Sequence, residues 1–196
     1  MPFAPNLFKG RIFASKPKHG DIVITKSFHD LSTTFIKRVV GLPGEKLEII
    51  NDQIYINDQP IKRIELGSVK DEKNQIYIKF KEIFPNGASN YSYKLKINPY
   101  FNDENFSNFG PYFIPENHYF LLGDNRDQSG DSRFQFGFVH FDNLIAKAQF
   151  IIFSTKDFLF DSKYTIIRQI KQVSNWLYGI RFNRIFNNLY NVQTNE

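Results

Sequence analysis

Hydrophobic and polar residues follow one another in short runs rich in β-branched and aromatic side chains along most of the chain, up to residue 153. Runs of this kind are typical of β-strands, whose successive side chains point to opposite faces of a sheet. The pattern therefore predicts an all-β core. The predicted strands are Asp21–Thr25, Thr34–Val40, Lys46–Ile50, Gln53–Ile56, Gln75–Phe80, Tyr91–Ile97, His118–Leu122 and Ala146–Phe153.

Turn-forming residues separate these runs. Gly41-Leu42-Pro43-Gly44 ends one strand, and Asn51-Asp52 and Asn57-Asp58-Gln59-Pro60 follow the next two. Asn, Asp and Gly tolerate the backbone conformations of tight turns, and Pro fixes one of them. The last two segments therefore predict consecutive β-hairpins.

The character of the chain changes twice. Residues 63–115 are rich in Asn, Lys and Tyr and predict a small β region inserted into a split core of residues 1–62 and 116–155. In the tail, 156–196, apolar residues recur at spacings of three and four, which predicts an amphipathic helix of about 25 residues. Two interpretations of this helix stay open, a position in a membrane interface and packing on the β core.

Composition narrows the possible chemistry. With 41% hydrophobic and 17% aromatic residues the chain is not of the disordered class, and with no cysteine it has no disulfide, thiolate ligand or cysteine nucleophile. The net charge of +5 favours an anionic partner such as a membrane surface, or reflects only a solvated lysine-rich surface. No helix-turn-helix or compact basic patch supports nucleic-acid binding. No apolar run is long enough to cross a bilayer.

One lysine lies where a strand pattern predicts an apolar face. In FIKRVVGLPG, residues 35–44, strand geometry places Lys37 on the same face as Phe35 and Val39, and Arg38 on the other face. A lysine that loses hydration has a lowered pKa and can then act as a general base. Hydrolases with a Ser-Lys pair use lysine in this way.

The run GDNRDQSGDSR, residues 123–133, holds three aspartates, two arginines and two serines between aromatic segments. It is either a solvated polar turn or a partly buried set of paired charges. Asp131 and Arg133 are two residues apart and are expected to pair along an extended strand, and Ser129 is a candidate to orient the amine of Lys37. Asp124, Asp127 and Asp131 do not have EF-hand spacing, so we predict no metal site.

Four segments resemble, in the same order, the characteristic sequence boxes of bacterial type I signal peptidases. They are GDIVITK at 20–26, FIKRVVGLPGE at 35–45, INDQPI at 56–61 and HYFLLGDNRDQSGDSRFQFGFVHFDNLIAKA at 118–148. Members of this family are membrane-anchored Ser/Lys endopeptidases that remove signal peptides from exported proteins. The resemblance spans roughly residues 3–153.

The resemblance implies a signal-peptidase-like antiparallel core and a role for each matching residue. Lys37 would be the general base and Ser129 the hydroxyl that holds its amine. Arg38 and the Asp131–Arg133 pair would brace the site, and Gly123 and Asp124 would be structural. The implied partners are signal peptides of secreted preproteins and a membrane surface, the implied location is the periplasmic face of the bacterial inner membrane, and no cofactor is implied.

The chain departs from this family at the nucleophile. The family's serine lies in a Ser-Met-x-Pro box upstream of the lysine, but the single methionine of this chain is Met1, and Met1-Pro2-Phe3 does not fit the box. Ser15, Ser27 and Ser32 lack the motif. We therefore expect a chain truncated at its amino terminus, with no nucleophile or membrane anchor and no activity alone. A separate chain that carries the nucleophile is one possibility.

Two other interpretations stay open. The chain could be a non-catalytic fragment or pseudoenzyme that binds a membrane surface, or binds extended peptides by strand addition. It could also be another Ser/Lys peptidase, such as a self-cleaving repressor or a conjugative processing protease. The run GDNRDQSGDSR argues against the repressor.

Overall fold

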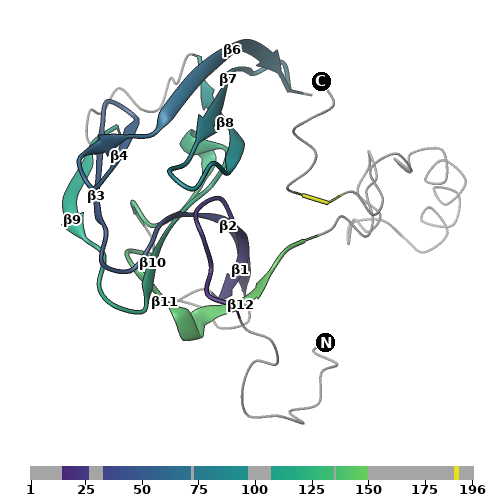
Figure 1. Ribbon diagram of the computed structural model, residues 1–196. Helices are drawn as coiled ribbons and strands as arrows, with labels where there is room; N and C mark the ends of the chain where they lie inside the picture. Colours follow the sequence, from purple (N-terminus) through teal and green to yellow (C-terminus); the bar gives the residue numbers. More distant parts are fainter. Residues whose placement is uncertain are drawn as a thin grey trace, which may run out of the picture. The chain divides into compact units, whose positions relative to one another are not determined.

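The computed structural model describes residues 15–26, 33–71, 73–96, 107–134, 136–149 and 188–189. The chain divides into two compact units, Met1–Ile145 and Ala146–Glu196. In the described part no helix is long and apolar enough to span a membrane. The predicted carboxy-terminal helix lies outside the described residues. The remaining description concerns the first unit, which consists of three antiparallel β-sheets (Figure 1).

A five-stranded sheet contains the strand that carries Lys37. Its order is β11-β10-β2-β1-β12, with β2 at the centre (Figure 1). β2 pairs antiparallel with β1, which directly precedes it in the sequence, and with β10, which follows much later. Bounds are β1 (Ile22–Lys26), β2 (Thr34–Gly41), β10 (His118–Leu122), β11 (Val139–His140) and β12 (Leu144–Lys147), the last crossing the boundary between the two units.

A four-stranded sheet of order β5-β4-β3-β9 is built on two tight hairpins. The turn residues Asn51 and Asp52 have φ of 48° and 65°, and Asn57 and Asp58 have φ of 50° and 64°. Asn and Asp adopt this left-handed region more easily than other side chains, so both predicted hairpins are confirmed. Bounds are β3 (Lys46–Ile50), β4 (Gln53–Ile56), β5 (Gln59–Pro60) and β9 (Phe109–Phe113).

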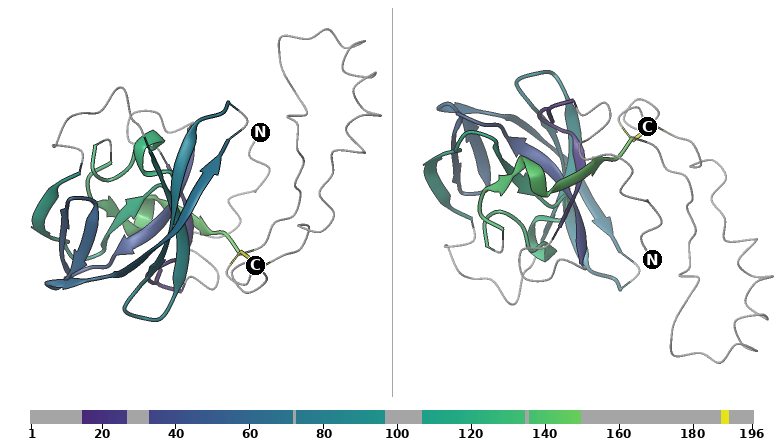
Figure 2. Two further views of the ribbon diagram at one scale, coloured as in Figure 1. Left: turned by 90° about the horizontal axis from the view of Figure 1, so that it is seen from above. Right: turned by 90° about the horizontal axis from the view of Figure 1, so that it is seen from below.

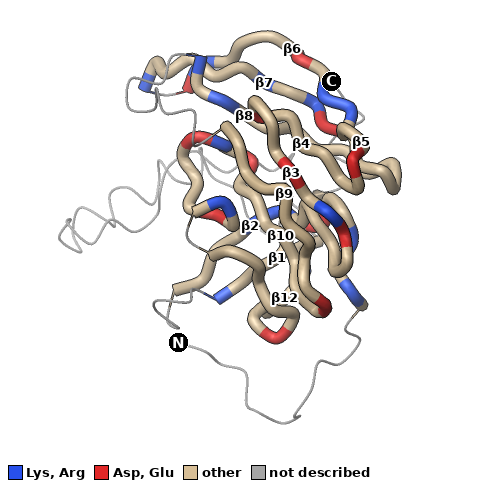
Figure 3. Tube along the Cα trace, turned by 90° about the vertical axis from the view of Figure 1, so that its left-hand side faces the viewer, with Lys and Arg blue, Asp and Glu red and all other residues tan. Residues whose placement is uncertain are grey.

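The third sheet, of order β6-β7-β8, is formed by β6 (Lys62–Lys70), β7 (Ile76–Ile83) and β8 (Ser89–Leu95). Figure 2 shows it as the longest ribbon of the unit, and Figure 3 shows that Lys and Arg positions recur along it. β6 is exposed along most of its length. This sheet lies within the predicted insertion of residues 63–115, but β9 of the same segment pairs with β3. The proposed domain division stays a prediction.

The two central strands separate two apolar cores. Val40, Phe120 and Leu122 belong to one buried cluster, which continues into β3 and β4. Val39, Tyr119 and Leu121 belong to the other, together with Val23 of β1. Each fully buried side chain of this size stabilises the fold by about 1.5–3 kcal/mol, so the alternation along β2 and β10 is firmly held. Lys37 and Arg38 consequently face opposite cores.

Some strand predictions differ from the structure. β3, β4 and β10 have the predicted bounds, and β1, β2, β7 and β8 are shifted or lengthened by a few residues. β12 begins at Leu144 rather than Ala146, and the strand predicted to continue to Phe153 ends at Lys147, before the described residues run out at 149. The strands β5, β6, β9 and β11 were not predicted.

Candidate active site

Lys37 lies on the face of β2 that borders the second apolar cluster. Its register partner in β1 is the buried Val23. The Phe35 ring, two residues earlier on the same face, has its centroid 5.7 Å from the Lys37 Nζ and packs edge-on against Phe136. A cation near a ring face is weakly stabilised, but apolar neighbours also remove water from the amine.

The amine of Lys37 reaches across to the loop that follows β10. Lys37 Nζ donates a hydrogen bond of 2.5 Å to Ser129 Oγ, a residue 92 positions later in the chain. Gly123 makes this contact possible, because a Cβ at this position would lie 1.9 Å from Ser129 Oγ and 2.3 Å from Ser129 Cβ. The Ser129 side chain therefore occupies the volume that any other residue at 123 would need.

The surroundings of Lys37 lower the pKa of its amine. Burial is the main cause, because it disfavours the charged form. The Asp131 carboxylate acts in the opposite direction, the Arg133 guanidinium lowers the pKa further, and Asp124 raises it. The net effect makes the neutral amine, the form that accepts a proton, more accessible than in an exposed lysine.

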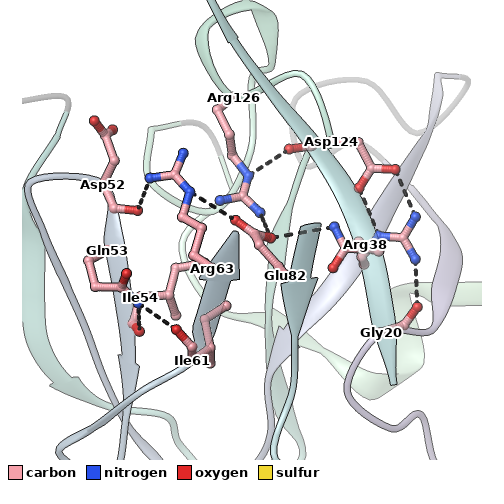
Figure 4. Close-up of polar contacts among 12 residues, drawn as sticks. Gly20, Arg38, Asp52, Gln53, Ile54, Ile61, Arg63, Glu82, Asp124 and Arg126 are labelled. Atoms are coloured by element: carbon pink, nitrogen blue, oxygen red, sulfur yellow. Dashed lines mark hydrogen bonds and ion pairs between the residues drawn. The ribbon is translucent and has the colours of Figure 1, made fainter. Parts of the chain in front are cut away.

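Arg38 is held on the opposite face by Asp124. Its Nε and Nη2 donate to Asp124 Oδ1 and Oδ2 at 2.7 and 2.8 Å, and its Nη1 donates to the Gly20 carbonyl at 2.8 Å (Figure 4). A two-point arginine–carboxylate contact fixes orientation as well as distance. The sequence interpretation placed Arg38 in a network with Asp131 and Arg133, whereas its carboxylate partner in the structure is Asp124.

Asp131 and Arg133 pair with each other. Arg133 Nε and Nη2 donate to the two Asp131 oxygens at 2.9 and 2.8 Å. The pair lies in a turn, closed by the Phe134 amide on the Asp131 carbonyl, and not along the extended strand that was expected. The fully buried Asp131 also accepts a hydrogen bond of 3.1 Å from the Gly123 amide. This carboxylate therefore fixes the backbone beside Ser129.

Two residues of the site's surroundings were missed by sequence reasoning. Arg126 Nη2 forms an ion pair of 2.5 Å with Glu82 Oε2 in β7, and Arg126 Nε donates to the Gly123 carbonyl at 3.2 Å. Figure 4 shows the Glu82 carboxylate turned toward the guanidinium groups of both Arg126 and Arg63. Arg126 could have been singled out, because it lies in the run GDNRDQSGDSR. Glu82 had no such signal, since a glutamate in a lysine-rich strand resembles a solvated face.

Among the described residues, the Lys37 amine, the candidate base, has one serine hydroxyl within hydrogen-bonding distance. Ser129 is the described serine whose hydroxyl contacts the Lys37 amine. Of the serines that precede Lys37, Ser15 is exposed, and Ser27 and Ser32 lie outside the described residues. Among the residues that the structure describes, no three His, Asp or Glu side chains are arranged to hold a metal ion. The arrangement is suited to proton transfer from a hydroxyl group.

The sequence of this chain is similar to those of known proteins. The family model for "Signal peptidase, peptidase S26" matches residues 5–153. A signal peptidase I from Rickettsia bellii is 51% identical over 190 residues, and the match covers 96% of this chain and 65% of that relative. A signal peptidase I from Rickettsia canadensis is 50% identical over 186 residues, covering 94% and 70%. The crystal structure of a signal peptidase I from Enterococcus faecalis has a TM-score of 0.43 at 25% identity, covering 68% and 97%.

This chain thus spans less than two thirds of the length of its Rickettsia bellii relative. Nothing in these matches supports a separate chain that carries the nucleophile. The match over residues 5–153 includes Lys37, Ser129 and the whole loop between β10 and β11.

Proposed function

Because the chain belongs to the signal peptidase family, peptidase S26, we propose that it provides the general base, Lys37, of a serine endopeptidase that cleaves signal peptides from exported preproteins. The observation that carries this proposal is the desolvated Lys37 amine hydrogen-bonded to Ser129 Oγ. The roles of Arg38, Asp131 and Arg133 follow from the same geometry, since they fix β2 and the loop that supplies Ser129.

The proposed reaction is an acyl transfer followed by hydrolysis. The neutral Lys37 amine accepts the proton of a nucleophilic serine hydroxyl while the serine oxygen attacks the peptide carbonyl carbon. The protonated lysine then gives this proton to the leaving amine, and the serine is left as an ester. Lys37 then takes a proton from water while the water oxygen attacks the ester carbonyl carbon, and it gives this proton to the serine oxygen, which leaves and becomes a hydroxyl again. Whenever the Lys37 amine is neutral, the hydrogen bond that it donates to Ser129 keeps its lone pair in one direction.

The proposed substrates are signal peptides of secreted preproteins, and the proposed setting is the periplasmic face of the inner membrane. The net charge of +5 supports contact with an anionic membrane surface. The bracing role of the Arg38–Asp124 pair and of Asp131 with Arg133 belongs to the same proposal.

The proposal is tested most directly in the cell, at the gene itself. Replacing Lys37 with Ala should leave preproteins with uncleaved signal peptides, and signal-peptide cleavage should fall by about 10²–10⁴-fold, the usual contribution of a general base. Lys26→Ala, at the exposed end of β1, is the matched control and should leave processing intact. Normal processing in the Lys37→Ala strain would refute the role of Lys37.

The purified chain tests the expectation of inactivity and the non-catalytic alternative together. Incubation with a synthetic signal peptide, followed by mass spectrometry, reports cleavage, and fluorescence anisotropy reports binding. Cleavage that depends on Lys37 would refute the expected inactivity. Saturable binding of the peptide, with no cleavage by the purified chain and no processing that depends on Lys37 in the cell, would favour a peptide-binding fragment.

A further inference from the structure

The loop that carries Ser129 is docked on the three-stranded sheet. The Tyr93 amide of β8 donates to the Asp124 carbonyl at 2.8 Å, and Tyr93 forms a parallel bridge with Asn125. The Leu95 amide of the same strand donates to Asp127 Oδ2 at 2.6 Å. The beginning of the loop therefore continues the sheet beyond β8, although the sheet contributes no side chain to the hydrogen bonds of Lys37.

A buried ion pair strengthens this attachment. Glu82 is fully buried in β7, and Arg126 is 6% exposed. Glu82 Oε2 accepts from Arg126 Nη2 at 2.5 Å and from Asn90 Nδ2 at 3.4 Å, while Arg63 Nε lies 3.8 Å from Glu82 Oε1 (Figure 4). A carboxylate removed from water to this extent is stable only with such partners. Glu82 and its neighbours thus define one position for the Arg126 guanidinium.

Arg126 transmits that position to Gly123. Its Nε donates to the Gly123 carbonyl at 3.2 Å, and its own carbonyl accepts from Arg133 Nη2 at 2.5 Å. Arg133 in turn holds Asp131, whose Oδ2 accepts from the Gly123 amide. Both polar groups of the Gly123 backbone are therefore fixed, one through Arg126 and one through Asp131. Gly123 is the residue against which the Ser129 side chain packs.

We propose that Glu82 is a positioning residue for the Lys37–Ser129 pair: through Arg126 it holds Gly123, and thereby Ser129, against the lysine amine. The role assigned to Lys37 comes from the proposed function, but the positioning itself is a structural claim about the loop. The three-stranded sheet, through Glu82, would then help to position the Lys37–Ser129 pair. A buried ion pair often stabilises no more than an apolar pair of the same volume, so stability alone does not account for the charge of this pair, and a geometric role does.

Two variants test this positioning. Glu82→Gln keeps the shape and removes the charge, and Arg126→Lys keeps a cation beside Glu82 but cannot hold Glu82 and the Gly123 carbonyl at once. Asp58→Asn is the control, because it removes a charge from the exposed Lys46–Asp58 pair. Two readouts apply: competitive acetylation of Lys37 against pH, with exposed Lys26 as the internal reference, and hydrogen exchange of residues 123–133. Neither readout requires catalysis.

In both variants, exchange over residues 123–133 should accelerate more than exchange over β3 and β4, whose amides report the overall change in stability. Release of the loop hydrates the Lys37 amine, and because burial is the main cause of its lowered pKa, the midpoint of its acetylation should move to higher pH. At pH 8 the reactivity of Lys37 relative to Lys26 should fall about threefold or more. Asp58→Asn should change neither readout.

An unchanged Lys37 midpoint in both variants would overturn the proposal, even if the loop exchanges faster. If Glu82→Gln does not fold, Arg126→Lys decides alone, because it leaves Glu82 with a cationic partner. The outcome is separable from that of the proposed function. Intact preprotein processing in the Lys37→Ala strain would refute the catalytic role of Lys37 but leave the positioning claim standing, because acetylation is measured in variants that keep Lys37. An unchanged midpoint would refute positioning but leave the catalytic role of Lys37 standing.

Discussion

At the scale of single residues, the site depends on the absence of a Cβ at position 123. Ser129 packs so closely on Gly123 that a Cβ at position 123 would overlap both the hydroxyl oxygen and the Cβ of Ser129. The Lys37 Nζ would lie 3.6 Å from the same Cβ, which is an ordinary contact. Glycine at 123 is therefore required by Ser129 and not by the lysine, and the φ angle of Gly123 is not in the left-handed region.

Gly123→Ala should displace Ser129 from Lys37 and cost about 1–3 kcal/mol of unfolding free energy, since overpacking forces the backbone to shift. The double variant Gly123→Ala/Ser129→Gly removes the clash and should regain most of this stability, but it cannot restore the hydrogen bond. Urea unfolding and Lys37 acetylation measure the two effects separately. Equal stability of Gly123→Ala and the unaltered chain would show that the packing is looser than described.

Sequence reasoning reached some of these residues and not others. Lys37 stands out because a charged residue interrupts an apolar face, and Ser129 followed from the resemblance of its run to a family box. The 92 positions between them left no pattern that predicts contact. Glu82 could not be found, because Lys79 and Lys81 precede it in β7 and its burial depends on Arg126, 44 residues later.

At the scale of elements, β2 is joined to the loop after β10 on both of its faces. Lys37 contacts Ser129 on one face, and Arg38 contacts Asp124 on the other. Since Asp124 and Ser129 belong to the same loop, side-chain contacts on both faces of β2 hold the strand to this loop. Backbone pairing of Arg38 with Leu122 adds a third connection between these elements.

A double-mutant cycle measures the Arg38–Asp124 contact. Arg38→Met and Asp124→Asn, singly and together, should give a coupling energy of about 1–2 kcal/mol in urea unfolding, because two charge-assisted hydrogen bonds are lost and Arg38 is buried. The same cycle on the exposed Lys46–Asp58 pair should give less than about 1 kcal/mol. Coupling energies of the same size at the two sites would contradict the role of Arg38 in holding β2 to the loop after β10.

The elements that were predicted correctly are those with clear local signals. β3 and β4 alternate between buried and partly buried positions and are joined by an Asn-Asp turn, so their bounds could be predicted. β6 was missed because KRIELGSVK is charged, contains Gly67 and is exposed almost throughout; its partner β7 makes it a strand. β9 was missed because its Gly110-Pro111 dipeptide resembles a loop, and its pairing with β3 spans a long stretch of chain.

At the scale of the whole molecule, one buried carboxylate connects the three-stranded sheet to the loop of the five-stranded sheet. Burial by itself would raise the pKa of Glu82, but the charge and hydrogen bond of Arg126, with further contributions from Ser92 and Arg63, outweigh it and hold the pKa below its usual value of 4.5. The charged form is therefore more stable in the folded than in the unfolded chain. Its contribution to stability is complete above pH 4.5 and is lost as the pH falls through the folded pKa.

Glu82→Gln should consequently lower the free energy of unfolding by about 3–5 kcal/mol at pH 7, as expected when one partner of a buried ion pair is removed. The difference between the variant and the unaltered chain should shrink as the pH falls from 4.5 through the lower folded pKa, because Glu82 is protonated first in the unfolded and then in the folded chain. Urea unfolding at a series of pH values measures this. A difference that is independent of pH would mean that the charge of Glu82 is not what stabilises the fold.

The two neighbouring cations of β2 have a further consequence, for the fidelity of folding. If β2 slipped by one residue between β1 and β10, Arg38 would face the apolar cluster of Val23 and Leu121, and Lys37 would face Asp124. The guanidinium would then lose its two-point contact with Asp124 and lie near the like charge of Arg133, and the lysine could not replace that contact. The residues that equip the site for proton transfer thus also penalise a misaligned central strand.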